Sequence, residues 1–423
     1  MITIRLQVEK IPNENGYRIF VKSLKHRILI NVLTAVLYKY GVREKSDKII
    51  IDLTNAEPPS FPNVVLPLAG LIKLYELEYN IDISLSYQNN SYIDEIRIDR
   101  PYNLDSDSSL IKNSIFDKVL SFNSEDDIEI LSTMLLKQLQ EAVVCKNGVI
   151  VGISWCINEI MDNVLNHSGL NEGFIMCQIH RKNNHVAFSI YDYGKGLFNT
   201  LSGTEYNPQS TIDAINLALT AGVTRDKKLG QGNGLWGVKN IVEYNLGNLA
   251  VYTGNSSYTK DYRESNPYET INEKLNYPAI RNQTTLIEFS IDFDRSIDVN
   301  TALGEYEPYE RIQMAWEEAT TDDDHITIYI KDVAVGTGTR RAGERIRKYV
   351  TNVLIQNNQP VELNFSGVEN ISSSFADEFV GKLVQSFGVI EFNKCFRVVK
   401  YSDYVKILLD KAISQRLASD GKK

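Results

Sequence analysis

The chain has 423 residues, a formal net charge of -9 and a hydrophobic content of 43%. This length exceeds one ordinary core, so two or three domains are expected. The composition is that of a soluble globular protein with no apolar run of the roughly 18 residues that cross a bilayer, and the acidic balance argues against a general nucleic-acid-binding surface.

The start of the chain and its cysteines favour a cytoplasmic protein. Residues 1–6 alternate as a strand does and lack the basic start and apolar centre of a signal peptide. The cysteines have no metal-ligand spacing and lie within apolar patterns, so we interpret them as buried thiols of a reducing compartment. They are Cys145, Cys156, Cys177 and Cys395.

The first hundred residues predict a small α/β unit. A short apolar strand, residues 48–53, leads through a proline-rich turn to helical periodicity over residues 64–77. Residues 81–87 alternate again as a strand, and the polar residues 103–113 are typical of a linker. We therefore predict a first domain over residues 1–105.

The next part predicts two helices and a hairpin. Ser124 is a suitable N-cap and is followed by acidic residues, so a helix is expected to run from there to about residue 144. A second helix is expected over about residues 148–167. The strands of the hairpin are expected at residues 174–180 and 185–191.

Two later strands complete this middle unit. They are expected at residues 249–253 and 285–293 and flank a polar excursion, residues 254–284, which we interpret as surface structure. Together these elements predict a second domain over residues 115–300.

The last part of the chain alternates between strands and helices, which predicts a third α/β domain over residues 308–423. The expected strands are residues 326–330, 361–365 and 396–400, and the expected helices are residues 341–356, 373–387 and 404–417.

The helix over residues 148–167 carries the first motif. Glu159 and Asn163 lie four residues apart, so they share one polar face with Asp162 and Asn166. An amphipathic helix with a solvated acidic side has the same pattern. The pair also suits chemistry on phosphates, because Mg²⁺ prefers hard oxygen ligands and a nearby carboxylate can act as a base.

The second motif, Asp-x-Gly-x-Gly, follows the strand 185–191 and consists of Asp192, Gly194 and Gly196. An ionised Asp only accepts hydrogen bonds, which suits recognition of the exocyclic amine of adenine. A simple strand-to-loop turn of the Asp-x-Gly kind is the alternative interpretation.

The third motif is a run of alternating glycines, Gly230, Gly232 and Gly234, before an apolar-periodic helix that begins with Leu235. Glycines at this position leave backbone N–H groups free to bind an anion, and the helix dipole adds to the attraction. The sequence contains no P-loop. A Rossmann arrangement is excluded as well, because the first glycine cluster lacks the compact βαβ spacing with an acid about 20 residues on.

In this order and at these intervals, the three motifs resemble those of the GHKL ATPases, the superfamily of gyrase-type enzymes, heat-shock chaperone clamps, histidine kinases and anti-sigma serine kinases. The resemblance covers roughly residues 124–294. It implies an α/β protein of the α+β sandwich type, whose central Bergerat-type domain has a mixed sheet and binds ATP and Mg²⁺.

The resemblance also implies a role for each motif. Glu159 would be the general base, Asn163 would bind Mg²⁺ through its amide oxygen, and Asp192 would contact adenine. His167 matches positions in the anti-sigma kinases, although a terminal His that contacts the last carbonyls of its helix is an equal alternative. The other implied nucleotide-binding residues are Gly194, Gly196, Thr224, Lys228, Gly230, Gly232, Gly234, Leu235 and Thr285.

A mobile ATP lid is implied over residues 197–229. Near its end lie Thr224, Arg225, Lys227 and Lys228, and one of these cations is expected to meet the γ-phosphate. A solvated basic loop is the alternative interpretation.

Residues 361–379 resemble a STAS-like domain, in which a strand delivers a loop Ser to the start of a helix. In anti-sigma-factor antagonists a GHKL kinase phosphorylates this Ser, which makes Ser372, Ser373 and Ser374 candidates for phosphorylation. Serines that only start a helix are the alternative, and the usual Asp-Ser-x-Gly sequence is absent. The first unit resembles the same architecture more faintly and retains only Ser60.

Two functions follow from the resemblance. The first is a signalling or regulatory protein that hydrolyses Mg-ATP or transfers its γ-phosphate to a protein Ser, with partners bound through the STAS-like units and a homodimer as one arrangement. The alternative is a nucleotide-gated interaction module, or a dimerising clamp, with little or no turnover. A histidine kinase is disfavoured, because the chain has only five His and none lies in a helical hairpin just before the ATPase. Neither a membrane nor nucleic acid is expected as a partner.

Overall fold

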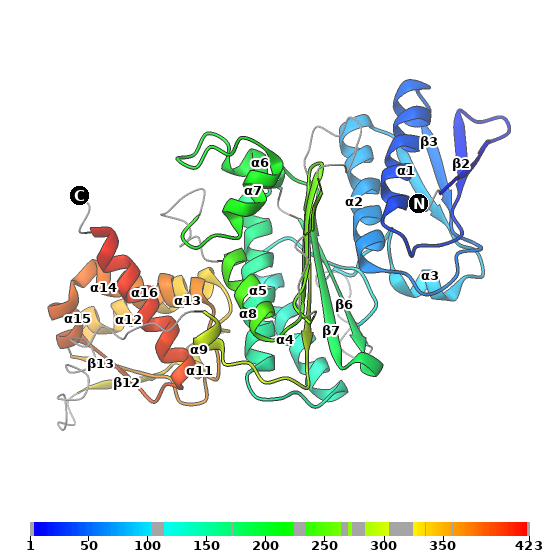
Figure 1. The fold of residues 1–423 in the computed structure, drawn as a ribbon. Helices are drawn as coiled ribbons and strands as arrows, with labels where there is room; N and C mark the ends of the chain where they lie inside the picture. The colour runs from blue at the N-terminus through cyan, green and yellow to red at the C-terminus, as the bar shows by residue number, and fades with distance from the viewer. Residues whose placement is uncertain are drawn as a thin grey trace.

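In a computed structural model, the described part of the chain forms three sheets with helices around them (Figure 1). Each sheet takes its strands from one continuous stretch of the sequence. This arrangement confirms the predicted α+β class. The structure describes residues 4–103, 114–170, 172–223, 234–263, 270–272, 284–303, 325–334, 336–357 and 359–420.

The N-terminal unit, residues 4–103, contains a mixed sheet. Its first two strands are antiparallel and the second, third and fourth are parallel to one another. In spatial order the strands are β1 (Gln7–Lys10), β2 (Gly16–Phe20), β3 (Lys48–Asp52) and β4 (Asp82–Ser86). The helices are α1 (Ile28–Leu37), a π-helical segment (Tyr38–Arg43), α2 (Pro62–Tyr79) and α3 (Ser91–Ile96).

The central unit, residues 114–303, is built on a sheet of seven described strands. In spatial order they are β10 (Thr270–Asn272), β9 (Ser256–Asp261), β8 (Asn248–Thr253), β11 (Thr285–Asp292), β7 (His185–Asp192), β6 (Gly173–His180) and β5 (Leu120–Phe122). Strands β9 and β10 extend the sheet where the sequence predicted only a surface excursion.

All pairings between these seven strands are antiparallel, so the expected mixed sheet is not formed. The reason is the position of β11. Strands β7 and β8 run in the same direction and are joined through helices, as in a parallel crossover, but β11 lies between them and is antiparallel to both.

Helices cover one face of this sheet. The long ones are α4 (Glu125–Ala142), α5 (Val149–His167) and α8 (Gly234–Tyr244), and the shorter ones are α6 (Gly196–Leu201), α7 (Thr211–Ala218) and α9 (Val299–Ala302). Helix α5 lies between its neighbours and packs on both. A Cβ atom at Gly237 would lie 2.1 Å from the Trp155 ring, so a glycine is what lets α8 approach α5.

The N-terminal unit covers the opposite face of the central sheet. Helix α2 packs on β6, β7 and β11. A Cβ atom at Gly70 would lie 2.2 Å from the Tyr191 ring. Buried residues of the sheet, among them Phe174 and Leu286, belong to the same hydrophobic cluster as the N-terminal unit.

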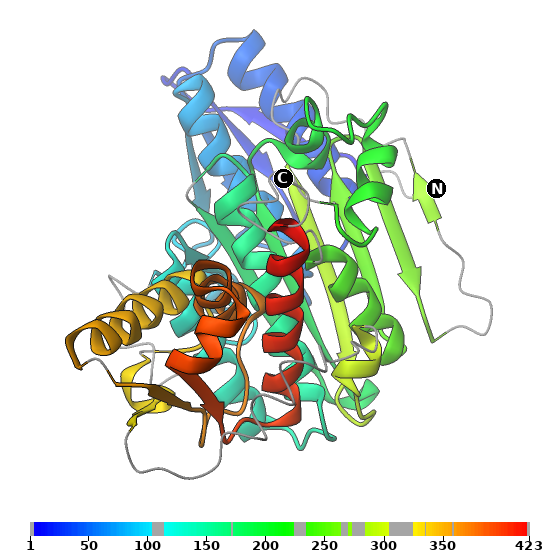
Figure 2. The ribbon, with the colours of Figure 1, turned by 90° about the vertical axis from the view of Figure 1, so that its left-hand side faces the viewer.

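The C-terminal unit, residues 325–420, lies beyond the helices that cover the central sheet (Figures 1 and 2). Its three described strands, β12 (Ile326–Tyr329), β13 (Val361–Asn364) and β14 (Phe396–Val399), are parallel. The helices are α11 (Ile330–Val333), α12 (Arg340–Asn357), α13 (Ser373–Ala376), a π-helical segment (Asp377–Gly381), α14 (Lys382–Phe387), α15 (Val389–Cys395) and α16 (Asp403–Asp420).

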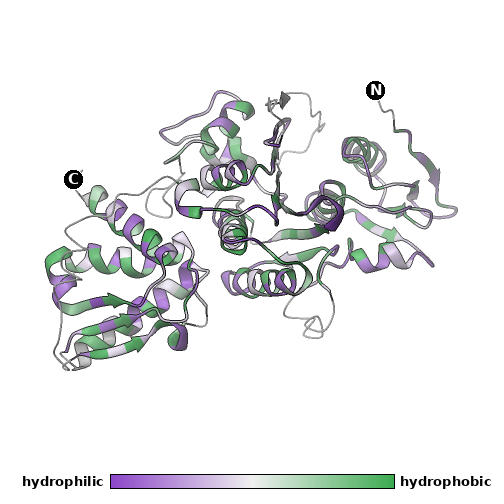
Figure 3. Ribbon diagram, turned by 60° about the horizontal axis from the view of Figure 1, so that its bottom comes forward, coloured by the Kyte–Doolittle hydropathy of each residue, from purple (hydrophilic) through white to green (hydrophobic). Residues whose placement is uncertain are grey.

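The hydrophobic cores do not separate the units cleanly. One cluster joins the N-terminal unit to the outer face of the central sheet, and another joins the central helices to the C-terminal unit. The division into three domains at residues 1–105, 115–300 and 308–423 therefore stays a prediction. None of the described helices is long and apolar enough to cross a bilayer, and Figure 3 shows hydrophilic and hydrophobic residues mixed along the helices.

Candidate nucleotide-binding site

Asp192 is the last residue of β7 and is 5% exposed. Its carboxylate accepts hydrogen bonds from the Gly194 N–H, at 2.9 Å, and from the side chain of Thr285, which is its neighbour on β11. Burial raises the pKa of Asp192 to about 7, although both hydrogen bonds act in the opposite direction. The structure thus joins three predicted residues in one buried polar group.

The loop after Asp192 is held against the end of α5. The Lys195 N–H donates to the Ser168 carbonyl at 2.8 Å, and a Cβ atom at Gly194 would lie only 2.3 Å from that oxygen. Gly196 then begins α6 with a φ of +71°, a conformation that favours glycine. Both predicted glycines are therefore required by the path of the backbone.

The first and third motifs meet at the start of α8. A Cβ atom at Gly234 would lie 3.1 Å from Glu159 Oε2 and 3.0 Å from Asn163 Nδ2. Both α5 side chains therefore lie beside the first turn of α8, where backbone N–H groups and the helix dipole favour an anion. The Leu235 side chain is 6% exposed and belongs to the core, so its contribution to the site would come from its backbone.

Two carboxyl groups lie one turn apart on α5. Burial raises the pKa of Glu159 to about 8, and the nearby Asp162 adds to the shift, whereas Lys411 and Arg340 oppose it. Burial likewise raises the pKa of Asp162 to about 6, and Oδ1 of Asp162 is a buried oxygen without a hydrogen-bond partner in the described chain. Shifted carboxyl groups that lie beside a helix N-terminus are typical of functional sites.

The C-terminal unit brings serines to these two carboxyl groups. The Ser373 hydroxyl donates a hydrogen bond to Oε1 of Glu159, and the Ser374 side chain hydrogen-bonds Asp162. Ser372 has a different role, because it is the N-cap of α13, where its Oγ accepts a hydrogen bond from a backbone N–H at 2.9 Å. The sequence indicates all three serines as candidates, but their position next to Glu159 depends on the fold.

Other contacts fix how the C-terminal unit sits on the central helices. The Arg341 N–H, at the start of α12, donates to Oε2 of Glu125 at 2.7 Å, and the Arg341 guanidinium pairs with Asp126 at 3.2 Å. Nδ2 of Asn370 lies 3.4 Å from Oγ of Ser154 on α5. These contacts hold the serine-bearing helix α13 over the polar face of α5.

Two cations of the C-terminal unit were not predicted as site residues. Lys411 on α16 is 7% exposed, and both it and Arg340 act electrostatically on Glu159. The sequence contains a signal for Lys411, because it lies three residues after the buried Leu408. A charged residue therefore falls on the apolar face of this helix. Arg340 has no comparable signal in the sequence.

Several predicted residues cannot be placed. Most of the glycine run and the cations at the end of the expected lid lie outside the described residues, and so does the side chain of His167. Within the described part of the lid, α6 and α7 form where no helix was predicted. The residues outside are Thr224, Arg225, Lys227, Lys228, Gly230 and Gly232.

The residues present fit a magnesium ion that is held mainly by phosphates. No group of three or more His, Cys, Asp or Glu in the described ranges could hold a metal alone. Mg²⁺ usually takes one or two protein oxygens and completes its shell with phosphates and water. The Asn163 amide and the unpartnered Oδ1 of Asp162 could provide such oxygens.

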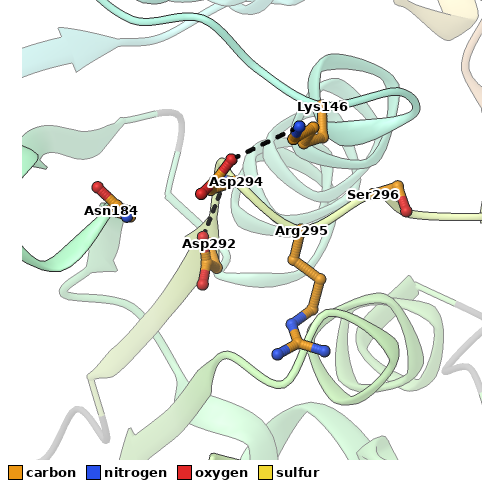
Figure 4. Close-up of a pocket in the computed structure, with 6 residues that line it drawn as sticks. All are labelled: Lys146, Asn184, Asp292, Asp294, Arg295 and Ser296. Carbon is orange, nitrogen blue, oxygen red and sulfur yellow. Dashed lines mark hydrogen bonds and ion pairs between the residues drawn. The ribbon is translucent and has the colours of Figure 1, made fainter.

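The surface pocket in Figure 4 does not compete with this site. Its volume is 580 Å³, and it is lined by Lys146, Asn184, Asp292, Asp294, Arg295 and Ser296. Its ion pair between Lys146 and Asp294 spans 3.9 Å, and both side chains are 61% exposed. A solvated pair of this kind contributes little and is not arranged for chemistry.

The comparisons with known proteins identify one part of the chain. The family described as a STAS-like domain of unknown function (DUF4325) matches residues 342–406, which include α13 with its serines. The C-terminal unit is STAS-like. No curated protein matches the chain significantly.

Among solved structures, the chain is similar to the topoisomerase IV ATP-binding domain of Francisella tularensis in complex with a small-molecule inhibitor. The sequences are 10% identical, the alignment covers 72% of this chain and 94% of that chain, and the TM-score is 0.22. A TM-score this low does not establish a common fold, so the assignment of the site rests on its own residues.

Proposed function

We propose that this protein binds Mg-ATP between α5, α8 and the end of β7, and that it transfers the γ-phosphate to Ser373 of its own STAS-like unit. The observation that carries the proposal is the hydrogen bond from the Ser373 hydroxyl to Glu159. This contact joins the predicted general base to a serine that the STAS-like resemblance makes a candidate acceptor.

The two ends of the site would bind different parts of the nucleotide. The buried group of Asp192 and Thr285 offers an acceptor to the amine of adenine. The first turn of α8 at Gly234 offers backbone N–H groups to the phosphates. Asn163, with the adjacent Asp162 oxygen, would hold Mg²⁺, which when bound shields phosphate charge.

Phosphoryl transfer would use Glu159 as the acceptor of one proton. A bond would form between the Ser373 oxygen and the γ-phosphorus, while the bond from that phosphorus to the β–γ bridging oxygen breaks and ADP leaves. The hydroxyl proton of Ser373 would pass to the Glu159 carboxylate along the existing hydrogen bond. Lys411 and Arg340 would help, because both favour the ionised form of Glu159.

Hydrolysis is the second candidate. Glu159 could direct a water molecule in the same way, but the Ser373 hydroxyl already occupies one of its carboxylate oxygens. Hydrolysis would therefore require the C-terminal unit to move, or Ser373 to be removed.

The test is to map the phosphate by mass spectrometry after incubation of the full chain with Mg-ATP. We expect phosphate on Ser373 in the wild type and in Ser374→Ala, and none in Ser373→Ala. Glu159→Gln should lose about 10²–10⁴-fold in rate, the usual contribution of a general base, and still bind nucleotide. Glu129→Gln is the matched control. It changes a partly buried Glu on the neighbouring helix α4, and this variant should transfer phosphate at the wild-type rate.

Unmodified serines in a wild-type protein that binds ATP would contradict the transfer. The nucleotide-gated interaction module would then be the better account. Label on Ser374 instead of Ser373 would contradict the assignment of the acceptor.

A further inference from the structure

Lys411 is a buried cation without a paired anion among the described residues. Its side chain belongs to a residue that is 7% exposed, and no described group forms a hydrogen bond or ion pair with its Nζ. Its Nζ lies 5.6 Å from the centroid of the Trp236 ring. An ammonium group at a mostly buried position is unfavourable unless it is paired or reaches solvent, so Lys411 is available to an anion that binds beside it.

The location of Lys411 indicates which anion. Trp236 is the third residue of α8, so the ammonium lies near a side chain from the first turn of the helix whose Gly234 borders Glu159 and Asn163. Lys411 also acts electrostatically on Glu159. Figure 2 shows α16 passing in front of the central helices, which agrees with these contacts. The cation therefore borders the phosphate end of the proposed site.

Arg340, the other described cation that acts on Glu159, is already held in ion pairs. Nη1 of Arg340 lies 3.3 Å from Asp377 and 3.3 Å from Glu378, two buried carboxylates of the C-terminal unit. Lys411 has no such pair in the described chain. Of the two, it is the cation that a bound phosphate could engage without breaking an ion pair.

We propose that Lys411 binds the γ-phosphate of the nucleotide, so that the STAS-like unit completes the phosphate site and distinguishes ATP from ADP. The proposal rests on the nucleotide site proposed above. Burial lowers the pKa of Lys411 and the nearby Glu159 opposes this shift, so an incoming phosphate would further favour the charged ammonium. Tyr404, seven residues earlier on the same face of α16, also lies in the electrostatic field of Glu159.

The test compares two nucleotides on the full chain. Lys411→Met keeps an unbranched apolar stem and removes the charge. Lys406→Met on the same helix is the control, because Lys406 is only partly buried and faces Asp410. Mg-ADP and a non-hydrolysable Mg-ATP analogue are titrated into each protein by calorimetry.

We expect Lys411→Met to weaken binding of the analogue by about tenfold or more, the scale of a charge-assisted contact. The affinity for ADP should stay within about twofold of the wild-type value. Lys406→Met should change neither affinity. Unchanged affinity for the analogue, or an equal loss for both nucleotides, would overturn the proposal. Failure of the wild type to bind either nucleotide would instead overturn the proposed function on which it rests.

Thermal unfolding without nucleotide gives an independent readout. Removal of an unpaired buried charge should leave the Tm of Lys411→Met equal to that of the wild type or higher, and the analogue should stabilise this variant less. A lower Tm, or a variant that does not fold, would show that Lys411 has a structural partner and would contradict the proposal.

Discussion

At the scale of single residues, the site is marked by carboxyl groups that burial keeps from ionising freely. Burial raises the pKa values of Asp192 to about 7, Glu159 to about 8 and Asp162 to about 6. Each of these groups costs stability at neutral pH, because its charged form is poorly solvated in the folded chain. Such a cost is expected where polar groups are held ready for a ligand.

Asp192→Asn tests this cost. The unfolded carboxyl titrates near its usual value of 3.8 and the folded one near 7, so between these values the folded state holds more protons and wild-type stability falls as pH rises. Asn carries no such penalty. Without nucleotide, we expect the variant to be more stable by roughly 1–4 kcal/mol above pH 7, with the difference disappearing toward pH 4.

Urea unfolding of both proteins across this pH range measures the difference. Asp82→Asn, at an exposed position on β4, is the control and should show no comparable gain. An advantage of Asp192→Asn that is the same at pH 4 and pH 8 would mean that the titration of Asp192 is not its cause.

At the scale of elements, the contact between α5 and α8 positions Glu159 beside Gly234. The close approach depends on Gly237, whose added Cβ atom would lie 2.1 Å from the buried Trp155 ring. The ring is packed on all sides in the core, so α8 would have to move. A displaced α8 would separate the glycine motif from the α5 side chains.

Gly237→Ala is therefore expected to destabilise the protein by roughly 1–3 kcal/mol, despite the higher helix propensity of Ala. Gly338→Ala is the matched control, because its nearest side-chain atoms would lie at an ordinary 3.6 Å. Chemical unfolding compares the two. Equal stability of Gly237→Ala and the wild type would show that α5 and α8 do not pack this closely.

Much of this element structure could be predicted. Periodicity and capping placed the α5 helix at residues 148–167, where it begins at Val149, and the hairpin that ends at Asp192. The insertion of β11 between β7 and β8 could not be predicted, because it depends on pairing between strands distant in sequence. The contact of Ser373 with Glu159 could not be predicted for the same reason, because the two residues are 214 positions apart in the chain.

At the scale of the whole molecule, the site is composite. The central unit provides Asp192, Glu159 and the start of α8, whereas the C-terminal unit provides Ser373 and Lys411. The motifs of the central unit were visible in the sequence because their residues are close together in the chain. The sequence marks Ser373 as a candidate acceptor but does not place it or Lys411 at this site, because only docking of the STAS-like unit brings them there.

The N-terminal unit contributes to this architecture from the other side. Oγ of Ser60, the serine that this unit retains in its loop, has no hydrogen-bond partner among the described residues, and the residue is 1% exposed. Its carbonyl accepts a hydrogen bond from Gln178 of the central sheet at 3.4 Å. Ser60 is thus buried against β6 and is not placed as an accessible acceptor of phosphate. A STAS-like identity of this unit stays a prediction.

The central claim is that the three motifs form one nucleotide site, and calorimetric titration of Mg-ATP into the full chain tests it most directly. We predict that the wild type binds and that Asp192→Asn, folded and more stable above pH 7, binds more weakly by roughly 1–3 kcal/mol, about 5- to 150-fold. Wild-type affinity in the folded Asp192→Asn protein, or no binding by the wild type, would contradict the account.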